Sequence, residues 1–160
     1  MPKKIAVIQD TREKRPLLFP KTLSVQGRKL IVEVRKETLR TGDYCLADHQ
    51  ESGLVERKAG LREIRQNFCT PDFARVKKQL DRLAKESTAP LLLLEASVSE
   101  LMTPTREFPN PGPIMQYLLN ELVARSISWM LTGACKYPTR RRQVGELVLR
   151  YLIAAAPQGA

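Results

Sequence analysis

Apolar and polar positions alternate along several short stretches of this chain, and this pattern predicts β-strands. Side chains in a strand point alternately to its two faces, so alternation marks a half-buried strand and a continuous apolar run marks a strand buried on both faces. The predicted strands are residues 4–9, 30–34, 43–47, 53–58, 90–96 and 128–131. The run at 90–96 (PLLLLEA) is the most continuously apolar and predicts the central strand.

Apolar residues three and four positions apart predict helices between these strands. The predicted helices are residues 61–68, a helix opened by Thr70 as cap and Pro71 as first residue, 113–125, and 138 to about 155. Proline and glycine predict loops at 14–28 and 103–113. This order of elements predicts an α/β fold, a mixed β-sheet flanked by helices, in a single domain with a core of about residues 4–155.

Charge narrows the range of partners. The 160 residues carry a formal net charge of +10 and a pI near 9.9, which favours a polyanion such as nucleic acid. No apolar run approaches the thickness of a bilayer, so we expect no membrane contact. No leader with an apolar centre begins the sequence, so we expect the protein to stay in the cytosolic compartment of its cell.

Several chemistries lack the residues that they need. Cys45, Cys69 and Cys135 are far apart and odd in number, which predicts free and mostly buried thiols. The eight glycines are scattered and form no phosphate-binding loop. The single histidine, His49, falls in a predicted turn, so a serine or cysteine nucleophile with a histidine base is hard to build.

The strongest candidate site lies between Gly42 and Lys58. If residues 43–47 and 53–58 are the arms of a hairpin, Asp43 falls nearly opposite Glu56, and Lys58 shares a face with Glu56. Two carboxylates suit Mg²⁺ or Mn²⁺, and a lysine can orient a water or offset phosphate charge. The alternative is an ordinary surface hairpin that carries an exposed Glu–Lys pair.

Other charged residues have two open interpretations each. Asp10, Arg12 and Glu13 follow the first strand, where they form either a functional loop or a solvated turn. The helix after Pro71 and the start of the last helix are basic, and each is either a phosphate-binding surface or a solvated face. The candidate DNA contacts there are Arg75, Lys78, Gln79, Arg140, Arg141 and Arg142.

Three separated blocks together resemble the nuclease domain of the XPF family of structure-specific DNA endonucleases, whose pattern is GD followed by ERK. The blocks are Asp10-Thr11-Arg12-Glu13, Gly42-Asp43-Tyr44 and Glu56-Arg57-Lys58. The resemblance continues through Arg75 and Gln79 and the strand at 91–95. The C-terminal part is similar to compact viral and bacterial members of the family, so the resemblance covers roughly residues 5–152.

This resemblance implies a restriction-endonuclease-like fold and Mg²⁺- or Mn²⁺-dependent cleavage of branched or junction DNA, such as flaps and forks, in repair, recombination or replication. It implies that Asp43 and Glu56 hold the metal with the backbone carbonyl of Arg57, and that Lys58 orients the attacking water. Asp10, Arg12 and Glu13 would complete the pocket, with Arg12 on a phosphate and Asp10 as a further candidate metal ligand.

Two departures from the family pattern stand out: Arg62 occupies the position of an expected acid and is followed by Glu63, and Ala74 replaces a common glycine. The resemblance also implies a homodimer or heterodimer through the C-terminal helices, no helix-hairpin-helix domain within these residues, and a location in the cytoplasm of a bacterium or infected cell, or in a eukaryotic nucleus. Two other functions stay open: an inactive DNA-binding or scaffolding subunit, and a basic structural protein.

Overall fold

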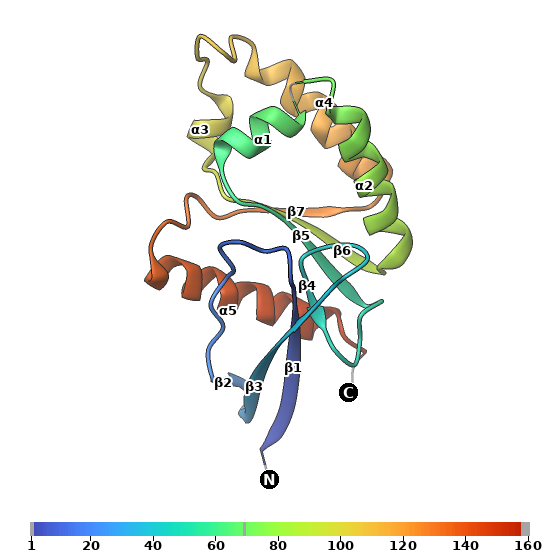
Figure 1. The fold of residues 1–160 in the computed structure, drawn as a ribbon, viewed down its shortest axis with the longest axis vertical. Coiled ribbons are helices and arrows are strands. Elements are labelled where there is room, and N and C mark those ends of the chain that lie inside the picture. The colour runs from blue at the N-terminus through green and yellow to red at the C-terminus, as the bar shows by residue number, and fades with distance from the viewer. Residues whose placement is uncertain (1, 69, 158–160) are drawn as a thin grey trace.

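A mixed β-sheet forms the centre of the computed structural model, which describes residues 2–68 and 70–157 (Figure 1). In these residues the sheet has seven strands in the order β2-β3-β1-β4-β5-β6-β7. The strands are β1 (Lys3–Asp10), β2 (Thr22–Val25), β3 (Arg28–Glu37), β4 (Tyr44–Leu46), β5 (Gly53–Lys58), β6 (Ala89–Leu94) and β7 (Ser128–Leu131). β1 is parallel to β3, and β5, β6 and β7 are mutually parallel, whereas β4 runs antiparallel to both β1 and β5.

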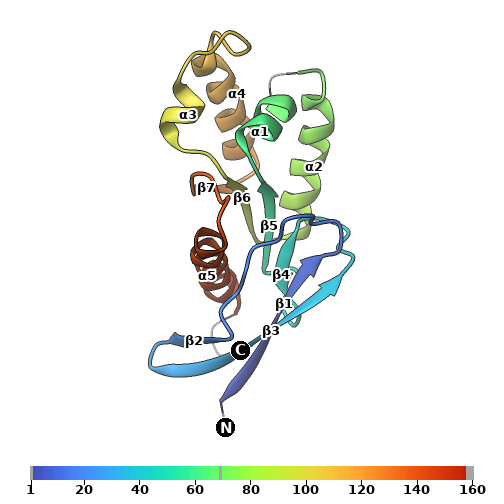
Figure 2. The same cartoon turned by 60° about the vertical axis from the view of Figure 1, so that its left-hand side comes forward.

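Helices cover both faces of the central strands. They are α1 (Leu61–Phe68), α2 (Phe73–Glu86), α3 (Val98–Met102), α4 (Pro111–Ala124) and α5 (Pro138–Ala155). Buried residues of α1 to α4 form one core with Leu54 and Leu92, while α5 forms a second core with Val55 and Leu91. We call these the front and back faces, and Figure 2 shows α5 separated from the other helices by the sheet. The α/β fold with a mixed sheet and flanking helices is therefore confirmed.

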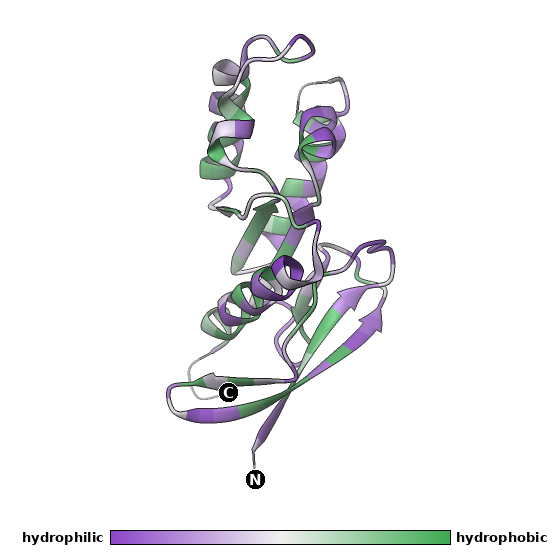
Figure 3. Cartoon of the chain, turned by 90° about the vertical axis from the view of Figure 1, so that its left-hand side faces the viewer, coloured by the Kyte–Doolittle hydropathy of each residue, from purple (hydrophilic) through white to green (hydrophobic). Residues whose placement is uncertain are grey.

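The alternating pattern predicted the strands well. The expected hairpin is present, with Tyr44 opposite Val55, so one step further along the register Asp43 falls opposite Glu56. Every residue of β5 is buried, and β6 lies between two parallel neighbours with its residues from Pro90 onward buried. Figure 3 shows the hydrophobic stretches of the strands and the mixed character of α5.

Two local predictions were wrong, and one helix was not predicted. Residues 14–28 are not all loop, because Thr22–Val25 pair with β3 as a short edge strand. The five-residue helix α3 was not anticipated, although a capping box closes its start. Thr70 does not cap α2: its hydroxyl donates to the Gln66 carbonyl at 2.6 Å, and the helix begins at Phe73.

Cys45 and Cys135 are free and buried, as expected, and Cys69 lies outside the described residues. His49 lies in the turn between β4 and β5, where its backbone N–H donates to Leu46 and its carbonyl accepts from Ser52. Across 2–68 and 70–157, none of the helices combines the length and the apolar character needed to cross a bilayer.

The loop after β1 crosses the edge of the sheet and lies against α5. Leu17 is 2% exposed in the back core, and Phe19 makes an edge-to-face contact with Tyr44 at 5.6 Å between ring centroids. A Cβ at Gly145 would lie 2.2 Å from the Leu18 carbonyl oxygen. Gly145 therefore lets the loop backbone approach the helix.

Gly145→Ala is expected to destabilise the protein by about 1–3 kcal/mol, because the loop and α5 must move apart to admit the methyl group. Urea denaturation would measure this change. Gln143→Ala, an exposed change on the same helix, serves as control and should stay within about 0.5 kcal/mol. Equal stabilities for the two variants would contradict the close approach.

Candidate active site

Asp43 is held in place by its backbone at the junction of three strands. Its N–H donates to the Val55 carbonyl at 2.7 Å, and its carbonyl accepts from the Asp10 N–H at 2.8 Å. Gly42, just before it, has a φ of +76°, and a Cβ there would meet the Val55 carbonyl oxygen at 3.2 Å. A glycine is therefore required before Asp43 both for its backbone angle and for its approach to β5.

Glu56 and Lys58 share the front face of β5 with Leu54, as alternation requires. The Lys58 Nζ lies 2.8 Å from Glu56 Oε1, and both side chains are about 5% exposed. Gln79 of α2 joins them, since its Nε2 donates to Glu56 Oε1 at 2.6 Å and its Oε1 accepts from Lys58 Nζ at 3.2 Å. Gln79 was predicted as a DNA contact, but its amide is engaged inside this pocket.

Burial shifts the pKa of both carboxyl groups of the pocket upward. Burial raises the pKa of the Asp43 carboxyl to about 8, and the nearby charge of Glu56 adds to the shift. Burial also raises the pKa of Glu56, although the Lys58 ammonium opposes that shift. A buried and a partly buried acid with raised pKa values at the end of a hairpin are typical of a functional site.

Asp10 and Arg12 form the rim of the pocket. Asp10 is fully buried, and its carboxylate accepts from the Arg12 guanidinium at 2.7 and 2.9 Å and from the Leu39 N–H at 2.8 Å. The hydrogen bonds from Arg12 hold the pKa of Asp10 below its usual range. Asp10 therefore fixes Arg12, whose side chain is 66% exposed and close enough to feel the charges of Asp43 and Glu56.

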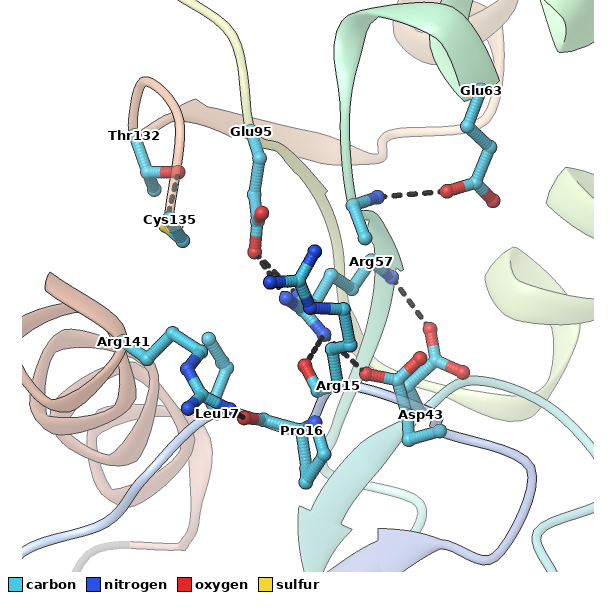
Figure 4. A network of polar contacts seen from close by, with 12 residues as sticks. Arg15, Pro16, Leu17, Asp43, Arg57, Glu63, Glu95, Thr132, Cys135 and Arg141 are labelled. Carbon is cyan, nitrogen blue, oxygen red and sulfur yellow. Dashed lines mark hydrogen bonds and ion pairs between the residues drawn. The ribbon is translucent and has the colours of Figure 1, made fainter. Parts of the chain in front are cut away.

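Arg57 points to the back face, opposite its two neighbours (Figure 4). Its guanidinium donates to Glu95 at 2.6 Å, to Glu13 at 2.5 Å and to the Arg15 carbonyl at 2.7 Å. Glu13 also accepts from the Tyr44 hydroxyl at 2.9 Å. Glu13 thus joins a back-face network that anchors β5 from behind, and its charge is close enough to raise the pKa of Asp43 and of Glu56.

Two acids in this region were not assigned a role from sequence. Glu95 follows β6, and its partner Arg57 could have been found from the parallel register of β5 and β6. Glu63 accepts from the Ala59 N–H at 2.8 Å, and its carboxylate lies 4.0 Å from Lys58 Nζ. Glu63 therefore lies near Lys58, and it directly follows Arg62, which occupies the position of the expected acid.

The donor set fits a hard divalent cation that keeps most of its waters. Among the described residues, hydrogen bonds to Asp43 and Glu56 use one oxygen of each carboxylate, Oδ2 and Oε1. The Arg57 carbonyl points to the same edge of β5 as the Val55 carbonyl, which accepts the Asp43 N–H. Within 2–68 and 70–157, no three His, Cys, Asp or Glu side chains group as metal ligands, so water would complete the shell.

The predicted DNA contacts divide between the two faces. Arg75 and Lys78 are exposed on α2, and Arg75 is one turn before Gln79, so it flanks the pocket. Arg140, Arg141 and Arg142 begin α5 behind the sheet, where Arg140 donates to the Thr132 carbonyl and Arg141 to the Pro16 carbonyl. The arginine triplet is thus separate from the front pocket.

This fold is similar to the folds of solved structures. The chain is similar to XPF from Aeropyrum pernix, with a TM-score of 0.65 and 19% identity over 96% of this chain and 63% of that chain. A second structure, XPF from Aeropyrum pernix in complex with DNA, gives a TM-score of 0.62 and 19% identity over 98% of this chain and 68% of that chain. No protein-family model and no curated protein sequence matches.

The chain therefore has an α/β, restriction-endonuclease-like fold similar to that of the XPF nuclease, as the sequence resemblance implied. It spans 63% of the length of the first of these structures. At 19% identity the likeness concerns the fold, and the chemistry of the site has to be argued from this chain's own residues.

Asp43→Asn is expected to stabilise the protein increasingly as the pH rises from about 5 to about 8. In the wild type the folded state keeps a proton on Asp43 that the unfolded chain releases near pH 4, so wild-type stability falls with pH up to about 8. Asparagine removes that titration. Denaturation at several pH values should show a difference that grows by about 1 kcal/mol or more, in order of magnitude.

Asp48→Asn, in the hairpin turn, is the control and should show no such pH trend. Mg²⁺ should then raise the melting temperature of the wild type and leave that of Asp43→Asn nearly unchanged, because a ligand stabilises only the state that binds it. A constant difference between the wild type and Asp43→Asn at all pH values would contradict the shifted pKa.

Glu95→Gln is expected to destabilise the protein by roughly 2–5 kcal/mol, because Arg57 would keep a buried charge with one partner removed. Chemical denaturation would measure the loss. Glu33→Gln removes an acid from an exposed pair with Arg35 and should change stability far less than Glu95→Gln does. A small effect at Glu95 would mean that the back-face network does not anchor β5.

Proposed function

We propose that this chain is an endonuclease that depends on Mg²⁺ or Mn²⁺ and cuts phosphodiester bonds in branched or junction DNA, such as flaps or forks, during repair, recombination or replication. One observation carries the proposal: Asp43, Glu56 and Lys58 meet at one end of a hairpin, where Glu56 is buried, Asp43 is partly buried, and both acids have raised pKa values. A merely structural pair would gain nothing from this repulsion.

Each residue has a role that follows from its position. Asp43 and Glu56 would hold the cation, with the Arg57 carbonyl on the same side of β5. When bound, the ion would offset phosphate charge and lower the pKa of the attacking water. Arg12, fixed by Asp10 and exposed at the rim, would hold a non-bridging phosphate oxygen.

Lys58 would orient the attacking water. Its ammonium now pairs with Glu56, and a cation on Glu56 would weaken that pairing. Gln79 and Glu63 would then keep the ammonium in place, because they lie 3.2 and 4.0 Å from Nζ. Partners on two sides would hold the Lys58 side chain in one orientation.

The polyanionic substrate is supported by charge. The net charge of +10 and the exposed Arg75 and Lys78 of α2 beside the pocket favour phosphate contacts. XPF from Aeropyrum pernix, which has a similar fold, has been solved in complex with DNA. A protein that acts on DNA would work in the cytoplasm of a bacterium or infected cell, or in a eukaryotic nucleus.

We also propose that the chain dimerises through α4 and α5, as a homodimer or with a related subunit. Val123 of α4 is 77% exposed, Tyr117 is 46% exposed, and Leu147 of α5 is 45% exposed, so apolar side chains are available on both helices. Light scattering of the purified chain would return a monomer mass if it does not form a homodimer.

The second candidate is an inactive DNA-binding or scaffolding subunit that partners an active nuclease. Its support is the basic surface alone, which needs no intact pocket. The two functions differ in cutting, not in binding.

Asp43→Asn and Glu56→Gln should each lower the rate of cleavage by more than about a hundredfold, because each removes a ligand charge. The assay uses labelled duplex, flap and fork DNA with Mg²⁺. Both variants should still bind DNA in the absence of Mg²⁺. Wild-type binding without any cutting, with Mg²⁺ or Mn²⁺, would favour the scaffolding subunit.

Arg75→Ala should weaken binding of all sequences alike and reduce the salt slope of the affinity by about one, since it removes one phosphate contact. Fluorescence anisotropy at several salt concentrations measures both. Lys29→Ala, an exposed cation at the start of β3, is the control. A preference for particular base sequences would argue against a backbone-directed surface.

A further inference from the structure

A basic strip leads from the pocket over the edge of the sheet to the back of the molecule. It starts at Arg12 on the front and continues through Lys14 and Arg15, which are exposed. Because Leu17 is buried in the back core, the chain changes faces within five residues, a reach of at most roughly 17 Å. The strip therefore begins at the place where a strand would be cut.

The strip continues onto the start of α5 because the loop is tied there. Arg141 donates from its guanidinium to the Pro16 carbonyl at 3.1 Å (Figure 4). The Arg141 carbonyl accepts from the Leu18 N–H at 3.4 Å. The contact between Leu18 and Gly145 holds the two segments together. Arg140 and Arg142, on either side of Arg141, are exposed.

The acidic side chains next to this strip are buried or paired with arginine. Asp10 is fully buried under Arg12, and the Glu13 carboxylate faces inward to Arg57 and Tyr44 with its side chain 15% exposed. The first acid of α5, Glu146, pairs with Arg150 at 2.7 Å. The side chains that face solvent along the strip are therefore cationic, and a polyanion fits them.

The course of the strip selects a single strand over a duplex. It bends from one face of the sheet to the other over a few residues, whereas duplex DNA stays straight over a persistence length of about 150 base pairs. An unpaired strand can make that turn. Tyr137 adds an aromatic ring that is 75% exposed, one helical turn before Arg141. Single-strand binding surfaces combine a basic path with aromatic rings on which bases stack.

We infer that Lys14, Arg15, Tyr137, Arg140 and Arg142 bind the unpaired strand of a branched DNA, leading it from the pocket to the back of the sheet. This inference rests on the proposed function for its substrate, because only branched DNA presents a duplex and a free strand together. The front pocket and α2 take the duplex, and the strip takes the diverging arm.

The test is binding of three labelled probes, measured by fluorescence anisotropy without divalent metal so that no cutting occurs. The probes are a blunt duplex, a fork with an unpaired oligothymidine arm, and single-stranded oligothymidine. Tyr137→Ala should weaken binding of the fork and the single strand by roughly fivefold or more, since one stacked base is lost. Blunt duplex should change by less than about twofold.

Tyr137→Phe keeps the ring and should bind like the wild type. Arg142→Gln should weaken the fork and lower its salt slope by about 0.7, the value for one phosphate of a single strand. Lys29→Gln, an exposed cation away from the strip, should leave the preference for the fork unchanged. Unchanged fork binding in Tyr137→Ala, or equal weakening of fork and duplex, would overturn the inference.

Binding and cutting separate this inference from the proposed function. Loss of single-strand binding in Tyr137→Ala, with a wild type that cuts no DNA in Mg²⁺ or Mn²⁺, would support the strip and refute the nuclease. A wild type that cuts DNA, with a Tyr137→Ala variant that binds forks normally, would support the nuclease and refute the strip.

Discussion

Three successive ionisable side chains on a fully buried strand impose the central constraint on this fold. Glu56, Arg57 and Lys58 each lose contact with water on β5, and a buried charge without a partner is costly. Alternation sends the first and third to the front, where they neutralise each other, and the second to the back, where Glu95 and Glu13 surround it. Both faces of the sheet must therefore be built correctly for either set of charges to be tolerated.

This arrangement does not balance the negative charge of Asp43. Its carboxylate receives the Arg57 N–H, but it has Glu56 as a neighbour and its pKa rises to about 8. The burial of the Asp43 carboxyl group lowers the stability of the fold, and natural proteins lose stability in this way at sites where function requires it. A divalent cation is the simplest group that would relieve both acids at once.

The sequence predicted what depends on local periodicity. The alternation in 43–47 and 53–58 determines which side chains share a face, so the approach of Asp43 to Glu56 follows from the order of residues alone. The pairing of Glu13 with Arg57 does not, because it depends on Arg57 reaching the back face and on Tyr44 from another strand. The start of α2 was missed because a local contact competes with capping, since the Thr70 hydroxyl bonds to Gln66, four residues earlier. The strand β2 was missed because Thr22–Val25 gain regular structure only by pairing with β3.

The docking of the first loop on α5 also limits the order in which the molecule can assemble. Pro16 and Arg141 are 125 residues apart in sequence, so the contact closes a very long loop and forms only after residue 141 has been synthesised. Glu13, which lies just before Pro16, helps to hold Arg57 behind the pocket. A nascent chain on the ribosome consequently has the residues proposed for cutting long before it has their geometry, so the proposed activity would begin only after this contact has formed.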